Sequence, residues 1–316
     1  MSKSSSDQAA GISRRSVLVG GLAGLAWTGL APSPGAAFAA DKVPVIDTHL
    51  HCFAGRDSKT FPYHERAPYR PEAAATPEHL LKCMDGAGVD YAVVVHPEPY
   101  QDDHRYLEHC LDVGKRRLKG TCLVFADQPD SVKQLPDLVK KLAVIAVRVH
   151  AYAPERLPPF GKPELKALWK QAAELGLAVQ IHFEPRYAPG FEPYVKEFAK
   201  TTVIIDHLGR PFQGTPKEHK VVLDWAGKYK NLIMKVSSLP EPERYPHRKI
   251  GPVVKGVTEA FGAERLIYGG GWGAGVSAKA YKAERERIAS YLGHLSAEER
   301  AAVLGGNAAK LFGFTS

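Results

Sequence analysis

The chain has 316 residues, 44% of them hydrophobic and 24% charged, which is typical of a globular protein with a large core. Its formal net charge is +8, but the basic residues are scattered and no nucleic-acid-binding motif accompanies them, so we expect no nucleic-acid partner. No stretch after residue 40 has the ~20 apolar residues needed to span a bilayer, so we expect no stable membrane span once the N-terminus is removed.

The first 39 residues have the pattern of an export signal. Arg14 and Arg15 form a twin arginine before an apolar run, Val17 to Leu30, that is rich in glycine and alanine. Ala37-Phe38-Ala39 then offers the small-x-small pattern of a cleavage site. We predict a Tat-type signal peptide over residues 1–39 and a periplasmic or otherwise exported protein. An uncleaved membrane anchor is the alternative.

Short β-branched runs alternate with helical patterns over residues 40–316. Eight almost continuously apolar runs predict parallel strands buried on both faces: Val45–His49, Tyr91–His96, Gly120–Phe125, Val144–His150, Ala178–His182, Val203–Asp206, Leu232–Val236 and Arg265–Gly269. Seven stretches between and after them predict helices: Pro77–Ala87, Asp103–Lys115, Pro163–Leu175, Glu192–Lys200, Lys217–Tyr229, Gly251–Phe261 and Ala278–Leu292. This alternation predicts an α/β fold of one domain, a (β/α)8 TIM barrel.

Histidines gather where the predicted strands end. The first strand ends in Asp47-Thr48-His49-Leu50-His51, and strand alternation puts His49 and His51 on the same face. Other strands end at His96, His150, His182 and His207. The C-terminal ends of barrel strands converge on one mouth, where active sites lie. Imidazole is a good zinc ligand, and three protein ligands plus a water make a catalytic zinc site.

Several blocks together resemble the amidohydrolase-related family, from about residue 44 to the C-terminus. They are Asp47–His51, the strand-ending His182, Ile205-Asp206-His207-Leu208-Gly209-Arg210-Pro211, Met234–Leu239 and Gly306–Gly313. The family has a distorted (β/α)8 barrel and includes hydrolases similar to 2-pyrone-4,6-dicarboxylate lactonase. Some members hold one zinc ion, whereas the lactonase-like branch can work without a metal.

The resemblance implies roles for individual residues. His49, His51 and His182 would bind one divalent metal, expected to be zinc, and His207 would contact water or substrate. The family also asks for an aspartate after the eighth strand, where this chain has Gly271. Three outcomes are open. Another base replaces the aspartate (Glu184, His207 or Glu98), the site runs different chemistry with a metal held by three histidines and no carboxylate, or the protein keeps the pocket and has lost catalysis.

Positive and aromatic residues near the strand ends suggest what binds. Guanidinium groups fork onto carboxylates, so arginines in these positions suit an anionic small molecule. The candidate substrate-binding residues are Arg148, Arg186, Arg210, Tyr152 and Trp272. The alternatives are a buried acid such as Asp47 as the partner of Arg148, a loop salt bridge between Glu184 and Arg186, and core positions for the aromatic residues.

The sequence thus predicts a hydrolase of a small carboxylated lactone, ester or amide, assisted by a metal. The alternatives are a small-molecule binding protein derived from such an enzyme, and a related decarboxylase. A metal-free site is also open.

Overall fold

The computed structural model describes residues 43–152, 154–244 and 248–314; the predicted signal peptide lies outside these ranges. Eight strands form one sheet in the order of the sequence, and all seven neighbouring pairs are parallel. The strands are β1 (Ile46–Leu50), β2 (Tyr91–Val95), β3 (Leu118–Leu123), β4 (Val144–Ala151), β5 (Ala178–Phe183), β6 (Val203–Ile205), β7 (Leu232–Val236) and β8 (Leu266–Tyr268). The predicted (β/α)8 barrel is confirmed.

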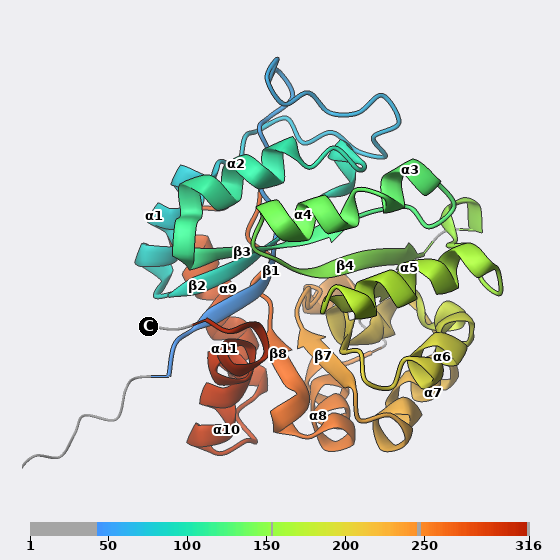
Figure 1. Cartoon of the computed structure of the whole chain (residues 1–316). Coiled ribbons are helices and arrows are strands. Elements are labelled where there is room, and N and C mark those ends of the chain that lie inside the picture. Colours follow the sequence, from blue (N-terminus) through green and yellow to red (C-terminus); the bar gives the residue numbers. More distant parts are fainter. Residues whose placement is uncertain (1–42, 153, 245–247, 315–316) are drawn as a thin grey trace, which may run out of the picture. The chain divides into compact units, whose positions relative to one another are not determined.

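Helices surround the strands (Figure 1). They are α1 (Pro77–Ala87), α2 (Arg105–Gly114), α3 (Pro129–Val132), α4 (Leu135–Lys141), α5 (Pro163–Glu174), α6 (Ala188–Glu197), α7 (Pro216–Lys228), α8 (Ile250–Phe261), α9 (Ala278–Tyr291), α10 (Ala297–Ala301) and α11 (Asn307–Phe312). No helix in the described part of the chain is both long and apolar enough to cross a membrane.

The helix predictions hold except at a few places. α1 begins and ends as predicted, because Thr76 caps its N-terminus and Gly88 ends it in the left-handed conformation. α6 begins four residues earlier than predicted and contains Pro193 in its interior, where proline has no N–H to donate to the carbonyl of Pro189. The short α3 and α4 between β3 and β4, and α10 and α11 at the C-terminus, were not predicted from the sequence.

Inward-facing residues form layers inside the barrel. Alternation along β4 turns Ala146, Arg148 and His150 inward, and their register partners on β5 are Ala178, Gln180 and His182. The lowest layer is apolar and consists of Ile46, Val93, Ala146, Ala178, Ile204 and Ile267. The layer above it is polar and buried: Thr121, Arg148, Gln180, Asp206 and Lys235. Along the barrel axis, the charged layer therefore lies between the apolar layer and the mouth.

The barrel closes between β8 and β1 through a run of glycines. The hydroxyl of Thr48 donates to Tyr268 O (2.6 Å), and Gly271 N donates to His49 O (2.8 Å). A Cβ on Gly269 would lie 2.7 Å from the Cβ of His49, so this approach requires glycine. Gly271 differs, because a Cβ there would meet nothing within 4 Å.

The C-terminal helices close the other end of the barrel. Figure 1 shows α11 beside the start of β1. Ala308, Phe312 and Phe314 join the lowest apolar layer. The π-helical turn Ala302–Gly306 brings Gly305 so close to Pro44 that a Cβ would lie 1.7 Å from the Pro44 carbonyl oxygen.

Candidate active site

One carboxylate and two cations form the centre of the polar layer. Arg148 donates from Nε (3.0 Å) and Nη2 (2.9 Å) to Oδ2 of Asp206. Nζ of Lys235 lies 3.5 Å from Oδ1 of Asp206 and donates to Thr48 O (2.8 Å) and Gln180 Oε1 (2.9 Å). Gln180 Nε2 in turn donates to both oxygens of Asp206. All four side chains are buried.

This layer carries net positive charge at neutral pH. Burial raises the pKa of Asp206, but Lys235 and Arg148 outweigh burial and hold that pKa well below its ordinary value. Burial, assisted by Arg148 and opposed by Asp206, lowers the pKa of Lys235 to about 8. Two cations thus face one carboxylate beneath the mouth.

Five imidazoles line the mouth above this layer. The ring centroids of His49 and His51 are 5.1 Å apart, those of His49 and His207 4.4 Å, and those of His182 and His207 5.1 Å. His150 follows at 5.4 Å from His182. Burial lowers the pKa of all five, to about 4 for His51 and about 3 for His207. The imidazoles are therefore neutral at neutral pH.

The polar layer fixes the tautomer of His182. Nη2 of Arg148 lies 3.1 Å from Nδ1 of His182. A guanidinium group can only donate, so Nδ1 accepts, and the proton of the neutral ring is on Nε2. His182 therefore presents an N–H donor at its opposite edge.

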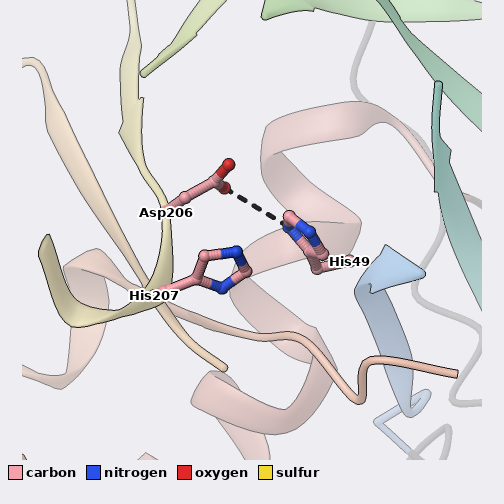
Figure 2. Close-up of side chains that lie close together, drawn as sticks. All are labelled: His49, Asp206 and His207. Atoms are coloured by element: carbon pink, nitrogen blue, oxygen red, sulfur yellow. Dashed lines mark ion pairs between the residues drawn. The ribbon is translucent and has the colours of Figure 1, made fainter. Parts of the chain in front are cut away.

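His49, Asp206 and His207 form a candidate metal cluster, with one possible ligand atom from each lying within 4.8 Å of the others. Figure 2 shows the three side chains pointing toward one another, with Nδ1 of His49 3.3 Å from Oδ1 of Asp206. The predicted ligands His51 and His182 are not in this cluster. His51 nevertheless donates from Nδ1 to Val95 O (2.7 Å), which leaves its Nε2 with a lone pair.

A left-handed turn presents His207 and Arg210 to a cavity. The four residues from His207 to Arg210 all have φ between 53° and 71°, and only Gly209 among them is a glycine. Such a run is strained for residues with a side chain, at roughly 1–2 kcal/mol each. The cavity beside it has a volume of about 220 Å³ and is lined by His182, His207, Leu208, Arg210, Phe212, Gln213, Ser237 and Ser238. Ser237 Oγ lies 2.8 Å from Nδ1 of His207.

A second group of polar side chains surrounds Glu98, just after β2. Its carboxylate accepts hydrogen bonds from Tyr152 Oη and from Nη1 of Arg156 (2.9 Å), and Oε1 lies 3.3 Å from Nδ1 of His150. Burial raises the pKa of Glu98, but the bonds from His150 and Tyr152 and the charge of Arg156 prevail and lower it to about 2. Glu98 is therefore ionised at neutral pH.

The remaining predicted site residues lie away from the 220 Å³ cavity. Arg186 is half-exposed, and its Nη2 lies 2.5 Å from Oε2 of Glu184, which is the loop salt bridge considered as the alternative. Arg148 pairs with a buried acid, but with Asp206 rather than Asp47. Trp272 is buried and donates its indole N–H to Val276 O (3.1 Å), so it is a core residue rather than a wall of the mouth.

Apart from Arg148, the charged and amide residues of the polar layer had no predicted role: Gln180, Asp206 and Lys235. The sequence does contain a signal for them. A charged or amide residue within an otherwise apolar buried strand needs a partner, and such residues in neighbouring strands provide partners for each other.

Comparisons with known proteins agree with the fold and with the motifs. The amidohydrolase family model matches residues 46–314. The chain is 27% identical over 241 residues to an L-fucono-1,5-lactonase of Burkholderia ambifaria, covering 72% of this chain and 79% of that protein. It is 31% identical over 165 residues to a 4-sulfomuconolactone hydrolase of Rhizobium radiobacter, covering 52% of each.

A solved structure shares the barrel. It is that of a probable 2-pyrone-4,6-dicarboxylic acid hydrolase of Acinetobacter baumannii with citric acid bound; the TM-score is 0.68 at 22% identity, covering 85% of this chain and 99% of that one. The family match spans the barrel from β1 to the residues after α11 and includes every histidine at the mouth. The chain therefore belongs to the amidohydrolase family.

Proposed function

We propose that this protein is a hydrolase that opens a small lactone carrying a carboxylate or another anionic group. The observation that carries the proposal is the pair formed by Arg148 and His182, which places an N–H donor beside a cavity above a positively charged layer. The relatives support it, since the names of three of them describe lactone or pyrone hydrolases.

His182 has the role of the electrophile in this proposal. When water adds to a lactone carbonyl, negative charge develops on the carbonyl oxygen. A preorganised donor at that oxygen contributes about 10²–10³-fold in rate. His182 provides such a donor at Nε2, and Arg148 behind it polarises the ring. His207, held at Nδ1 by Ser237, orients the attacking water.

The charge of the site selects an anionic substrate. The positive charges of Arg148 and Lys235 and the negative charge of Asp206 leave a net charge of one positive unit below the mouth. Arg210 lines the cavity itself. Two relatives point the same way, since sulfomuconolactone and pyrone dicarboxylic acid are anionic at neutral pH. We assign the substrate anion to Arg210.

His49, Asp206 and His207 lie within reach of one ion, but the chemistry around them argues against a resident divalent metal. A catalytic zinc needs about three protein ligands. His182 offers an N–H instead of a lone pair, and both oxygens of Asp206 already accept from Arg148 or Gln180. Gly271 stands at the position of the family aspartate, so that possible ligand is missing. In addition, Nζ of Lys235 lies 3.5 Å from Nδ1 of His49, and the charge of Lys235 would repel a cation bound there. We propose that hydrolysis here does not require a metal.

Metal analysis tests this part of the proposal. Plasma mass spectrometry of the purified protein should find far less than one metal per chain, and lactone hydrolysis should survive prolonged treatment with EDTA. One zinc per chain that is lost in His49→Ala, together with activity lost on chelation, would restore the predicted zinc site.

Proton release in a pH-stat tests the reaction itself. The panel contains 2-pyrone-4,6-dicarboxylate and 4-sulfomuconolactone as anionic lactones, with L-fucono-1,5-lactone and the dimethyl ester of the dicarboxylate as neutral compounds. We expect kcat/KM to be at least about tenfold higher for the anionic lactones, and Arg210→Gln to remove this preference mainly through KM. No hydrolysis of any lactone would overturn the proposal, and a preference for the neutral compounds would overturn the role of Arg210.

A further inference from the structure

Glu98 and His150 form a buried pair at the edge of the mouth. His150 is the last inward residue of β4, and Glu98 begins the short 3-10 turn after β2 (Glu98–Tyr100). Their side chains are 13% and 7% exposed, and Nδ1 of His150 lies 3.3 Å from Oε1 of Glu98. An ionised carboxylate only accepts, so the proton of the neutral imidazole is on Nδ1, and Nε2 carries a lone pair.

That lone pair has no hydrogen-bond partner within the described residues, although Nε2 is buried. Leaving a buried acceptor unpaired costs about 1–3 kcal/mol, so we expect a water or substrate molecule to pair with it. The orientation of the ring is otherwise fully determined, because Glu98 is itself held by Tyr152 and Arg156. A fixed imidazole with a free lone pair is suited to accept a proton.

His150 also lies where a base is needed. It lines a cavity of about 360 Å³ together with Glu98 and Arg156, whereas His182 lines the cavity of about 220 Å³. The two imidazole rings are 5.4 Å apart, edge to face. A carbonyl bound at His182 would therefore lie near the His150 ring, although the two rings line different cavities.

We propose that Glu98 and His150 are the general-base dyad of this hydrolase, in place of the carboxylate that is missing at Gly271. The inference rests on the proposed lactone hydrolysis. Nε2 of His150 takes a proton from water as the oxygen adds to the carbonyl carbon. The ring C–O bond then breaks, and the same proton passes from Nε2 to the leaving alkoxide. Glu98 stabilises the transient imidazolium, and the net reaction adds one water to give the hydroxy acid.

The other candidate bases are already engaged. The Glu184 carboxylate is paired with Arg186, and His207, whose Nδ1 lies 2.8 Å from Ser237 Oγ, is the group that orients the water. Glu98 accepts from three side chains and serves as the group that positions His150.

Three substitutions distinguish a general base from a residue with only a structural role. His150→Gln keeps an N–H for Glu98 and an acceptor at the free edge but cannot carry a proton. We expect kcat to fall about 10²–10⁴-fold with KM changed less than about threefold. Glu98→Gln should lower kcat by about tenfold or more at unchanged KM. In His150→Gly, added imidazole should restore part of kcat in a saturable manner.

His96→Gln and His96→Gly are the matched controls. His96 follows β2, is buried and has an unpartnered Nδ1, but its Nε2 donates to Gln101 O (3.0 Å) rather than to a carboxylate. We expect only a small loss of kcat in these variants and no rescue by imidazole. An active parent whose His150→Gln variant keeps kcat within threefold would overturn the dyad. An inactive parent would instead overturn the proposed function, and the dyad with it.

Discussion

Arg148 is the residue whose side-chain geometry determines most of the chemistry at the mouth. It donates to Asp206 through two nitrogens and to His182 through one of them. The planar guanidinium group can satisfy both partners at once, whereas an ammonium group is a single point charge. The tautomer of His182 therefore depends on the shape of this side chain as well as on its charge.

We predict that Arg148→Lys lowers kcat by about 10–100-fold while the barrel stays folded, because the fixed donor at His182 is lost. Nitrogen-15 NMR of histidine-labelled protein should show His182 protonated at Nε2 in the parent and as a tautomer mixture in the variant. A variant with an unchanged His182 signal and a normal kcat would contradict this role.

Glu98 gives the stability of the protein a specific pH dependence. Its pKa is about 2 in the folded chain against an ordinary value of 4.5. The folded state therefore binds this proton less readily, and the stabilisation from the ionised carboxylate is complete above about pH 5 and is lost as the pH falls toward 2. We predict that Glu98→Gln is less stable than the parent at pH 6 and that the gap narrows at pH 3.5. Urea unfolding at both pH values checks this; a gap independent of pH would contradict it.

At the scale of elements, the turn Ala302–Gly306 fits against the start of β1 with no room for a methyl group at one position. A Cβ on Gly305 would lie 1.7 Å from the backbone oxygen of Pro44, whereas the nearest atom to a Cβ on Gly306 would be Cγ1 of Val43 at 3.3 Å. Backbone cannot move aside cheaply, but the exposed side chain of Val43 can.

We predict that Gly305→Ala destabilises the protein by about 3 kcal/mol or more, and that the neighbouring Gly306→Ala changes stability by less than about 1 kcal/mol. Denaturant unfolding of the two variants makes the comparison. Equal stabilities would show that the turn can shift away from β1.

Strand alternation could predict much of the site. Residues two apart in a strand face the same side, so Arg148, two residues before His150, also faces inward. By the same rule Gln180, two residues before His182, and Lys235, two residues before Ser237, face inward. This rule predicts three of the five residues of the polar layer.

Other features depend on contacts that no local pattern contains. The register is irregular between Asp47 and Leu50, so alternation fails in β1, and Asp47 accepts from Tyr281 of α9 (2.5 Å) instead of facing Arg148. Trp272 follows Gly271, whose φ of +69° turns the chain into the core. The tautomer of His182 and the pairing of Glu98 with His150 join residues 34 and 52 positions apart, so they require the folded barrel.

In the whole molecule, residues at one end of the barrel stabilise the fold, and residues at the other end form the site. Phe312 packs into the lowest apolar layer, while Phe212 lines the 220 Å³ cavity at the mouth. We predict that Phe312→Ala lowers stability by about 3–5 kcal/mol but leaves kcat/KM unchanged at temperatures where the variant is folded. Phe212→Ala should raise KM. Thermal melts and lactone kinetics test both, and a KM effect from Phe312 would contradict the separation.

The predicted export route belongs to the whole molecule too, although residues 1–39 lie outside the described ranges. We propose that Arg14→Lys, Arg15→Lys in the full chain abolishes export, because the Tat route depends on the twin arginine. Fractionation of the producing cells with an antibody to the barrel checks this. Continued export of the double variant would contradict it.

The seam between β1 and β8 has a consequence for the order of events during synthesis. β1 needs the backbone of residues 268–272 to complete its hydrogen bonds, and the segment before it needs Gly305. The ribosome must therefore synthesise nearly the entire chain before β1 can contact β8. Until then the half-built sheet exposes two open edges, which are sites of aggregation. We expect chains stalled before residue 266 to be held by chaperones rather than to reach a native-like state.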